Sequence, residues 1–193
     1  MSEYFKYVDE LKKCLNSVVV TRADGSKLDA DQGLDHWCAM TADLMQANKT
    51  MYFAGNGASA MMASHMAADA SKNGGFRALA FNDPALMTAV SNDVCYEQSF
   101  ALPLKRFADP GDMLVTISSS GNSPNVVAAL EAAGSLGLKT VTLSGMKEDN
   151  KSRQMGDLNF YVPGITYGMA ECSHQAILHC WLDVFMARCE ARS

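Results

Sequence analysis

The motif best suited to chemistry on an anion is a six-residue polar loop that carries four serines. These are Ser118, Ser119, Ser120 and Ser123. The apolar run Asp112–Ile117 before them predicts a strand, and Pro124 after them suits the first turn of a helix. Serine hydroxyls and the free N–H groups of a helix N-terminus bind phosphate oxygens without a lysine.

A polar turn whose serines only cap the next helix is the alternative interpretation of this serine loop. Four serines in one strand-to-helix connection favour anion binding, and Gly121 allows close approach of the backbone to a ligand. The loop lacks the Gly-Lys-Ser/Thr of a Walker loop and is not a G-x-S-x-G nucleophile elbow.

A second loop between a predicted strand and a predicted helix could direct backbone donors at the same ligand. It consists of Gly55, Asn56, Gly57, Ala58 and Ser59. Its G-x-G pattern alone is weak, because many strand-to-helix turns contain it. The next predicted strand does not end in an acidic residue, so dinucleotide binding is not favoured.

Two pairs of titratable residues could supply acid–base or metal chemistry. His65 and Asp69 are four residues apart on a predicted helix and share one face, although an isolated pair of this kind is more often a capped or core histidine beside a solvated aspartate. Glu171 and His179 are eight residues apart, about 12 Å along a continuous helix. Two histidines and two carboxylates would suit zinc.

The elements expected around these loops alternate between strand and helix. Helices are expected at 3–18, 31–47, 58–71, 125–136 and 171–188, strands at 50–54, 77–81, 112–117, 139–143 and 158–162, and a helical stretch at 84–107 with a break near Asn92-Asp93. This order predicts an α/β fold with a doubly wound parallel sheet between helices. The segment 21–27 is expected to be a turn, with no strand between the two leading helices, which would pack against another subunit.

Composition narrows the class of protein further. A chain of 193 residues with 48% hydrophobic residues fits one globular domain, and a net charge of -5 argues against nucleic-acid binding. No signal peptide or membrane-spanning run is visible, and the six scattered cysteines are expected to be reduced thiols. We therefore expect a cytoplasmic protein without a membrane partner.

Taken together, the two loops and the histidines His174 and His179 resemble the sugar isomerase (SIS) domain, and within it the phosphoheptose isomerases. The resemblance implies a flavodoxin-like single domain over 1–193, with leading helices at 1–48 and a sugar-phosphate-binding core at 49–193. It also implies interconversion of sedoheptulose 7-phosphate and a manno-heptose 7-phosphate by a homotetramer.

The resemblance also implies roles for single residues. The phosphate would be held by Ser118, Ser119, Ser120 and Ser123, and the sugar by Asn56, Gly57, Ala58, Ser59, Asn92, Asp93 and Glu171. The catalytic base would be Asp69 and the acid His179. Several family members bind zinc at positions that match His65, Asp69, Glu171 and His179.

The sequence departs from the family pattern at the chemical positions more than in the serine loop. Asp69 stands where the family has glutamate, Glu171 where it has glutamine, and Gly168 where it has a sugar-contacting aspartate. Displacing a catalytic base by about 1 Å can cost on the order of a hundredfold in rate. A non-catalytic SIS protein, which senses a sugar phosphate or binds the replication initiator DnaA, is therefore the alternative function.

Overall fold

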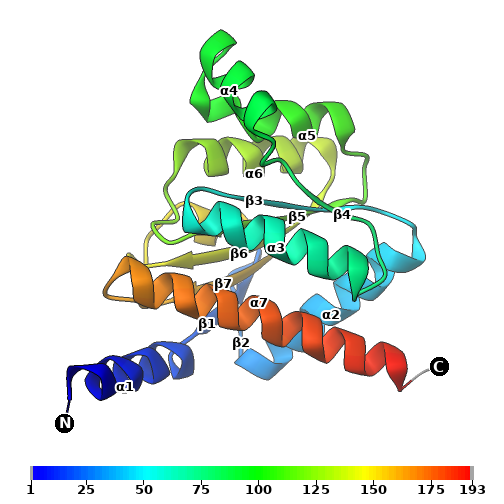
Figure 1. Cartoon of the computed structure of the whole chain (residues 1–193). Helices are drawn as coiled ribbons and strands as arrows, with labels where there is room; N and C mark the ends of the chain where they lie inside the picture. The colour runs from blue at the N-terminus through cyan, green and yellow to red at the C-terminus, as the bar shows by residue number, and fades with distance from the viewer. Residues whose placement is uncertain (1, 192–193) are drawn as a thin grey trace.

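The computed structural model describes residues 2–191, which form a sheet covered by helices on both faces (Figure 1). The strands are β1 (Val19–Arg22), β2 (Lys27–Leu28), β3 (Met51–Gly55), β4 (Ala78–Ala80), β5 (Met113–Ser118), β6 (Lys139–Gly145) and β7 (Leu158–Val162). The helices are α1 (Glu3–Asn16), α2 (Ala30–Gln46), α3 (Ala58–Lys72), α4 (Pro84–Asp93), α5 (Ala101–Phe107), α6 (Pro124–Leu136) and α7 (Tyr167–Glu190), with 3₁₀ turns η1 (Tyr96–Gln98) and η2 (Ser152–Gln154).

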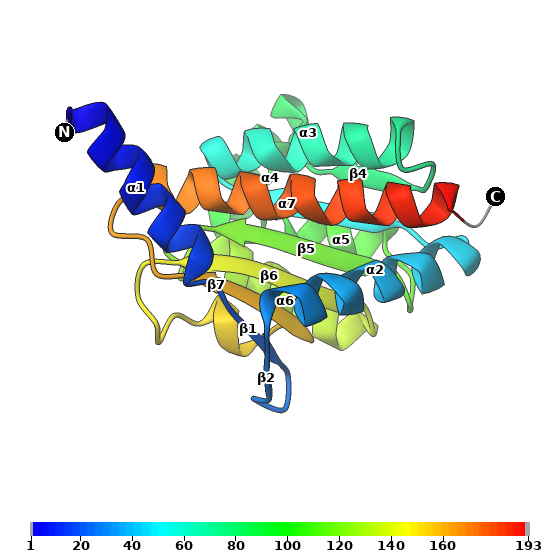
Figure 2. The same cartoon turned by 90° about the horizontal axis from the view of Figure 1, so that it is seen from below.

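The sheet order is β2-β1-β7-β6-β5-β3-β4, and the five strands from β7 to β4 are parallel. Their side chains alternate between two cores. Val115 and Ile117 pack with α2, α3 and α7 on one face, whereas Leu114 packs with α5 and α6 on the other. The predicted α/β fold with a doubly wound core is confirmed, and Figure 2 shows α3 and α7 side by side on their face.

The expectation of no strand between the leading helices is wrong. Residues 19–28 form the hairpin β1–β2, which pairs antiparallel with β7 and makes the sheet mixed. Val20 is fully buried opposite Phe160, and Gly25 turns the hairpin at φ +80°. The β-branched residues Val19 and Val20 are the strongest strand signal in this hairpin. Sequence reasoning missed it because the residues between its two short strands are polar.

The closing helix begins four residues earlier than expected. Thr166 is its N-cap, and its hydroxyl accepts a hydrogen bond of 3.2 Å from the Met169 N–H. Glu171 therefore lies inside α7 and not at its first turn. The predicted break in the helical stretch 84–107 is confirmed, since α4 ends at Asp93 and α5 begins at Ala101.

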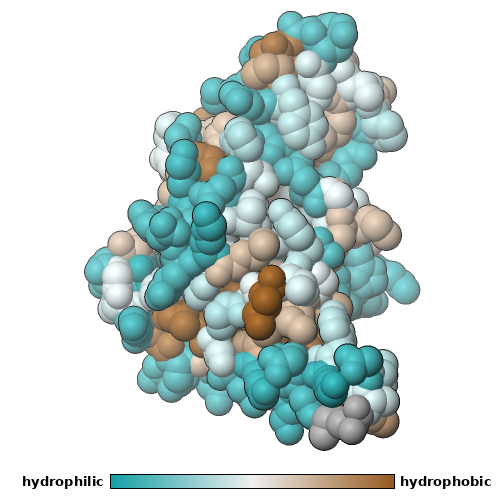
Figure 3. Space-filling view, turned by 90° about the vertical axis from the view of Figure 1, so that its left-hand side faces the viewer, coloured by the Kyte–Doolittle hydropathy of each residue, from teal (hydrophilic) through white to brown (hydrophobic). Residues whose placement is uncertain are grey.

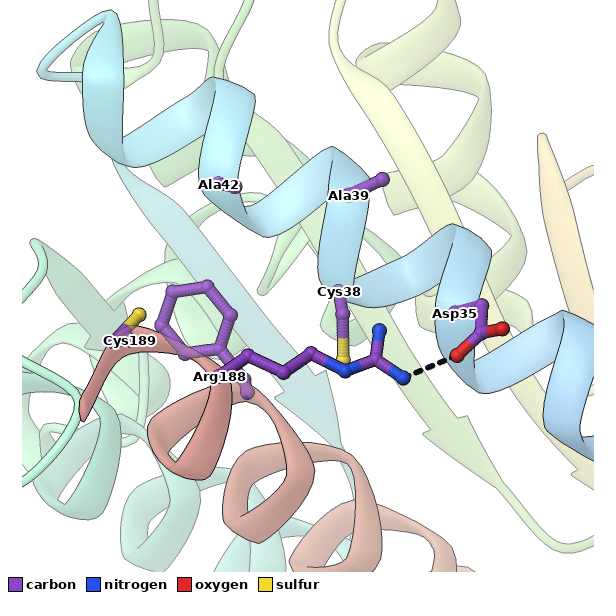
Figure 4. Close-up of a pocket in the computed structure, with 7 residues that line it drawn as sticks. Asp35, Cys38, Ala39, Ala42, Arg188 and Cys189 are labelled. Atoms are coloured by element: carbon purple, nitrogen blue, oxygen red, sulfur yellow. Dashed lines mark hydrogen bonds and ion pairs between the residues drawn. The ribbon is translucent and has the colours of Figure 1, made fainter. Parts of the chain in front are cut away.

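Helices α2 and α7 are held together by stacked aromatic rings and an ion pair. The Trp37 and Trp181 ring centroids are 4.3 Å apart, and Arg188 pairs with Asp35 beside a crevice of about 100 Å³ (Figure 4). Burial raises the pKa of the Cys38 thiol in that crevice to about 11, so this thiol is protonated at neutral pH.

Helix α1 lies across the start of α7 and extends beyond the sandwich (Figure 2). Its exposed apolar side chains include Tyr4, Phe5 and Val8. Its predicted role in subunit packing stays a prediction. Within residues 2–191, no helix combines the length and the apolar character needed to span a bilayer.

The contact between α2 and the hairpin generates a stability prediction. A Cβ at Gly33 would lie 2.8 Å from Val20 Cγ1 and 3.3 Å from Phe160 Cε1. Gly33→Ala should therefore lower the free energy of unfolding by about 1–3 kcal/mol in urea titrations. Gly134→Ala, in the interior of α6 with no atom within 4 Å of the added methyl, is the control and should raise it by about 0.5–1 kcal/mol.

Candidate active site

The two predicted ligand loops meet where the direction of strand order reverses. From β3 the chain proceeds outward to β4, whereas β5, β6 and β7 proceed the other way. In open α/β sheets, ligands bind beyond the carboxyl ends of the strands at this reversal. Gly55 at the end of β3 pairs with Ile117 of β5, so the glycine loop and the serine loop leave the sheet side by side.

The serine loop is folded by its own polar groups and leaves donors free for a ligand. The Ser118 hydroxyl accepts a hydrogen bond of 3.2 Å from the Gly121 N–H and lies 3.4 Å from the Ser123 hydroxyl. Ser123 is the N-cap of α6, and within the described chain its side chain makes no capping bond. The Ser119 hydroxyl is buried without a partner in residues 2–191. These groups and the α6 N-terminus can bind an anion.

The loop opens into a pocket of about 120 Å³ at the carboxyl edge of the sheet. Its lining residues are Asn56, Ser59, Ile117, Ser118, Ser119, Ser120, Ser123, Tyr167 and Glu171. Among the residues that the structure describes, no lysine or arginine lines it. Figure 3 shows this side of the molecule as a mixture of hydrophilic and weakly hydrophobic residues with a few strongly hydrophobic ones. Any anion in this pocket must be held by dipoles and hydrogen bonds.

Asn56 is held in the pocket wall by a network that sequence reasoning missed. Its side-chain amide pairs reciprocally with that of Asn125 at 2.8 and 2.9 Å, and its Oδ1 also accepts a 2.7 Å hydrogen bond from the Tyr96 hydroxyl. Asn125 in turn donates to the Ser99 hydroxyl. One N–H of Asn56 is left for a ligand. The pairing joins residues 69 positions apart, for which the sequence contains no local signal.

His65, Asp69 and His179 form a second polar group on the neighbouring stretch of α3 and α7. One ligand atom from each residue lies within 4.8 Å of the others, His65 Nε2 is 3.3 Å from Asp69 Oδ2, and the two imidazole centroids are 5.3 Å apart. Two imidazoles and a carboxylate are a donor set that zinc accepts. Within residues 2–191, Glu171 is not part of this group and instead lines the serine-loop pocket.

The pocket and the second polar group lie along the same pair of parallel helices (Figure 2). On α3, Ser59 lines the pocket and His65 follows six residues later, about 9 Å along the axis. On α7, Glu171 lines the pocket and His179 follows after about 12 Å. The histidines therefore lie about two helical turns from the pocket along both helices.

The sequence and the fold of this chain are similar to those of known proteins. Residues 6–145 match the SIS domain. The chain belongs to the SIS domain family. A phosphoheptose isomerase of Fusobacterium nucleatum subsp. nucleatum is 37% identical over 145 residues, 72% of this chain and 73% of the relative, and one of Sodalis glossinidius is 32% identical over 82% of each chain. The structure of phosphoheptose isomerase GmhA from Neisseria gonorrhoeae shares the fold with a TM-score of 0.83, at 24% identity over 95% of this chain and 97% of that one.

Several residues that the SIS resemblance places at the sugar lie outside the pocket lining. Gly57 caps α3 at φ +56° and Ala58 begins that helix, and both are exposed. Asn92 and Asp93 end α4, are exposed, and bond to each other at 2.8 Å. Tyr167 lines the pocket and was not predicted, because an aromatic residue at the start of a helix has no distinctive pattern.

His174 is the second histidine on α7 and differs from His179 in its surroundings. It is fully buried, and neither ring nitrogen has a hydrogen-bond partner in residues 2–191. Burial lowers the pKa of His174 from 6.5 to about 4, and the nearby Ser144 carbonyl opposes this shift without the geometry of a regular hydrogen bond. His174 is therefore neutral near pH 7.

This buried imidazole makes stability depend on pH. Between pH 6.5 and about 4 the unfolded chain binds a proton at His174 that the folded chain does not, so stability falls as pH falls through this window. The full shift corresponds to about 3 kcal/mol. Urea unfolding of the parent and His174→Gln should give a free-energy difference that shifts in favour of the variant at lower pH. The control His36→Gln, at a half-exposed imidazole, should keep most of the parent's dependence. A pH-independent difference for His174→Gln would contradict the assignment.

Proposed function

We propose that this SIS protein is an aldose–ketose isomerase whose substrate is a heptose phosphate, sedoheptulose 7-phosphate. The supporting observation is that two polar features lie along the parallel helices α3 and α7. One is the serine-loop pocket, whose described lining has no lysine or arginine, and the other is the His–Asp–His group. An open-chain sugar phosphate bound at one end presents its other end to this group. The names of the relatives, phosphoheptose isomerases at 32–37% identity, support the same activity.

In this proposal each part of the site has one task. Ser118, Ser119, Ser120 and Ser123, with the α6 N-terminus, bind the phosphate, while Asn56, Gly57, Ala58, Ser59, Asn92, Asp93 and Glu171 contact the sugar. Asp69 removes the proton from the carbon next to the carbonyl, and His179 transfers a proton between the two oxygens. The enediolate formed between these steps requires stabilisation by a nearby donor or cation.

Zinc is the metal that the His65–Asp69–His179 group fits best. When bound, it would supply Lewis-acid stabilisation of the enediolate oxygens. Glu171 as a fourth ligand requires an approach that this arrangement does not provide. Binding a metal lowers the basicity of Asp69, so its roles as ligand and as base compete.

The setting we propose is a cytoplasmic homotetramer built from one SIS domain over 1–193. Exposed apolar residues on α1, including Tyr4 and Phe5, support a packing role for the leading segment. A sensor of sugar phosphates would keep the pocket and need no base. Binding of sedoheptulose 7-phosphate without turnover by the parent protein would favour that alternative.

A substitution at Asp69 distinguishes a loss of catalysis from a loss of phosphate binding. Asp69→Asn should reduce the isomerisation rate of sedoheptulose 7-phosphate by a factor of about a hundred or more, because the amide cannot accept the carbon-bound proton. Zinc content should fall with it, whereas the dissociation constant for inorganic phosphate should change by less than about twofold. Asp43→Asn on α2 is the control for loss of one surface charge. Equal turnover of parent and Asp69→Asn would remove Asp69 from the mechanism.

A substitution at Ser120 tests whether the serine loop binds phosphate. Ser120→Ala should weaken binding of inorganic phosphate and of the sugar phosphate about tenfold, because a hydrogen bond to a charged group is lost. Calorimetric titration measures both constants. Ser135→Ala, also on a serine but near the exposed end of α6, should leave them unchanged. An unchanged affinity in Ser120→Ala would contradict the loop assignment.

A further inference from the structure

The segment that joins β6 to β7 packs directly on the serine loop, and none of the roles above uses it. Its backbone donates two hydrogen bonds to the loop. The Ser152 N–H bonds to the Gly121 carbonyl at 2.9 Å, and the Lys151 N–H bonds to the Asn122 side-chain oxygen at 3.0 Å. A segment 29 residues away in sequence therefore holds two adjacent positions of the serine loop, Gly121 and Asn122.

Asn150 fills the space beneath Gly121. It is fully buried, and a Cβ at Gly121 would lie 2.0 Å from its Oδ1. Gly121 also has φ +63°, a conformation that side chains disfavour. The Asn150 amide donates 2.7 Å and 3.5 Å hydrogen bonds to the Lys147 and Gly145 carbonyls, and its Oδ1 accepts one of 3.0 Å from the Arg153 N–H. The amide is thus held by its own segment while one side supports the loop.

The supporting segment is itself anchored to β7. The Arg153 guanidinium lies 4.3 Å above the centre of the Tyr161 ring and bonds to the Glu148 carbonyl at 2.9 Å. The Tyr161 hydroxyl donates a 2.8 Å hydrogen bond to the Met146 carbonyl. The segment is therefore tied at Met146 and at Arg153 to one buried aromatic residue of the sheet.

We propose that Asn150 is a positioning residue for phosphate binding, which holds the serine loop in the conformation that receives the anion. This inference rests on the proposed function of the loop. A loop of serine and glycine loses more conformational freedom on binding than most segments, and a loop ordered before the ligand arrives avoids that cost. Because no lysine or arginine lines the pocket within the described part of the chain, correctly aimed donors are the main source of affinity.

A double-mutant cycle on full-length protein tests the contact, with inorganic phosphate and sedoheptulose 7-phosphate as probes. Asn150→Ala should raise KM and the phosphate dissociation constant about tenfold while kcat changes by less than about twofold, because the loop is loosened but the acid–base group is untouched. Gly121→Ala should weaken phosphate binding by more than about tenfold, since the new methyl meets Asn150. In the double variant the clashes with the Asn150 Oδ1 and Cγ are gone and only the 2.7 Å contact with the Cβ of residue 150 remains. The combined loss of affinity should therefore be clearly smaller than the product of the two single effects.

Asn159→Ala is the matched control. Asn159 is a buried asparagine on β7 with four hydrogen bonds to Thr142, Gly156 and Thr21. Its replacement should lower the melting temperature without changing phosphate affinity, which separates positioning from general stability. Asn122→Ala, at an exposed residue, removes the Lys151 contact without a buried change and should raise KM a few fold.

Each outcome decides the proposal. Unchanged phosphate affinity in Asn150→Ala, or single effects that multiply in the double variant, overturns the positioning role while leaving the phosphate loop intact. If Asn150→Ala does not fold, unchanged KM in Asn122→Ala overturns it and a raised KM supports it. A parent protein that binds neither inorganic phosphate nor sedoheptulose 7-phosphate overturns the proposed function itself and this inference with it.

Discussion

The parallel pairing of β3 with β5 is the constraint on which the rest of the site depends. It brings together two strand ends that are more than 60 residues apart and opens a crevice between the helices that follow them. The approach is close: a Cβ at Gly55 would lie 2.7 Å from Ser59 Cβ and 2.8 Å from the Ile117 carbonyl. Only glycine at this position lets α3 begin next to the serine loop. The pocket therefore exists because one residue has no side chain.

The same pairing explains why the pocket and the His–Asp–His group lie apart along the helices. Helices α3 and α7 both start at the carboxyl edge of the sheet and run back along one face, so residues near their starts line the pocket and residues two turns later form the His–Asp–His group. The two histidines of α7 differ in burial. His174 faces the core and stays neutral, whereas His179 faces His65 across the helix pair. One helix thus carries a buried imidazole and, five residues later, one that faces a second histidine.

Sequence reasoning succeeded where the signal is local. The five parallel strands and the serine loop follow from apolar runs, turn residues and Pro124, all within a few residues of the feature they predict. It failed for the β1–β2 hairpin, whose two-residue second strand is too short for a periodic pattern. It also missed Tyr96, Asn125 and Asn150, since each acts through a partner distant in sequence. In the sequence, an asparagine that makes such a contact cannot be told from an ordinary loop or helix residue until its partner in the fold is known.

The absence of lysine and arginine from the lining that the structure describes governs how a ligand is captured. Fixed dipoles lose their attraction within a few ångströms, whereas ionic fields reach about 8–10 Å in physiological salt. In the proposed function, a sugar phosphate is therefore recognised only after it has entered, and the Glu171 carboxylate in the wall disfavours ligands with additional negative groups. Such a pocket does not attract anions by long-range electrostatic steering, so abundant polyanions such as nucleotides are not drawn towards its entrance.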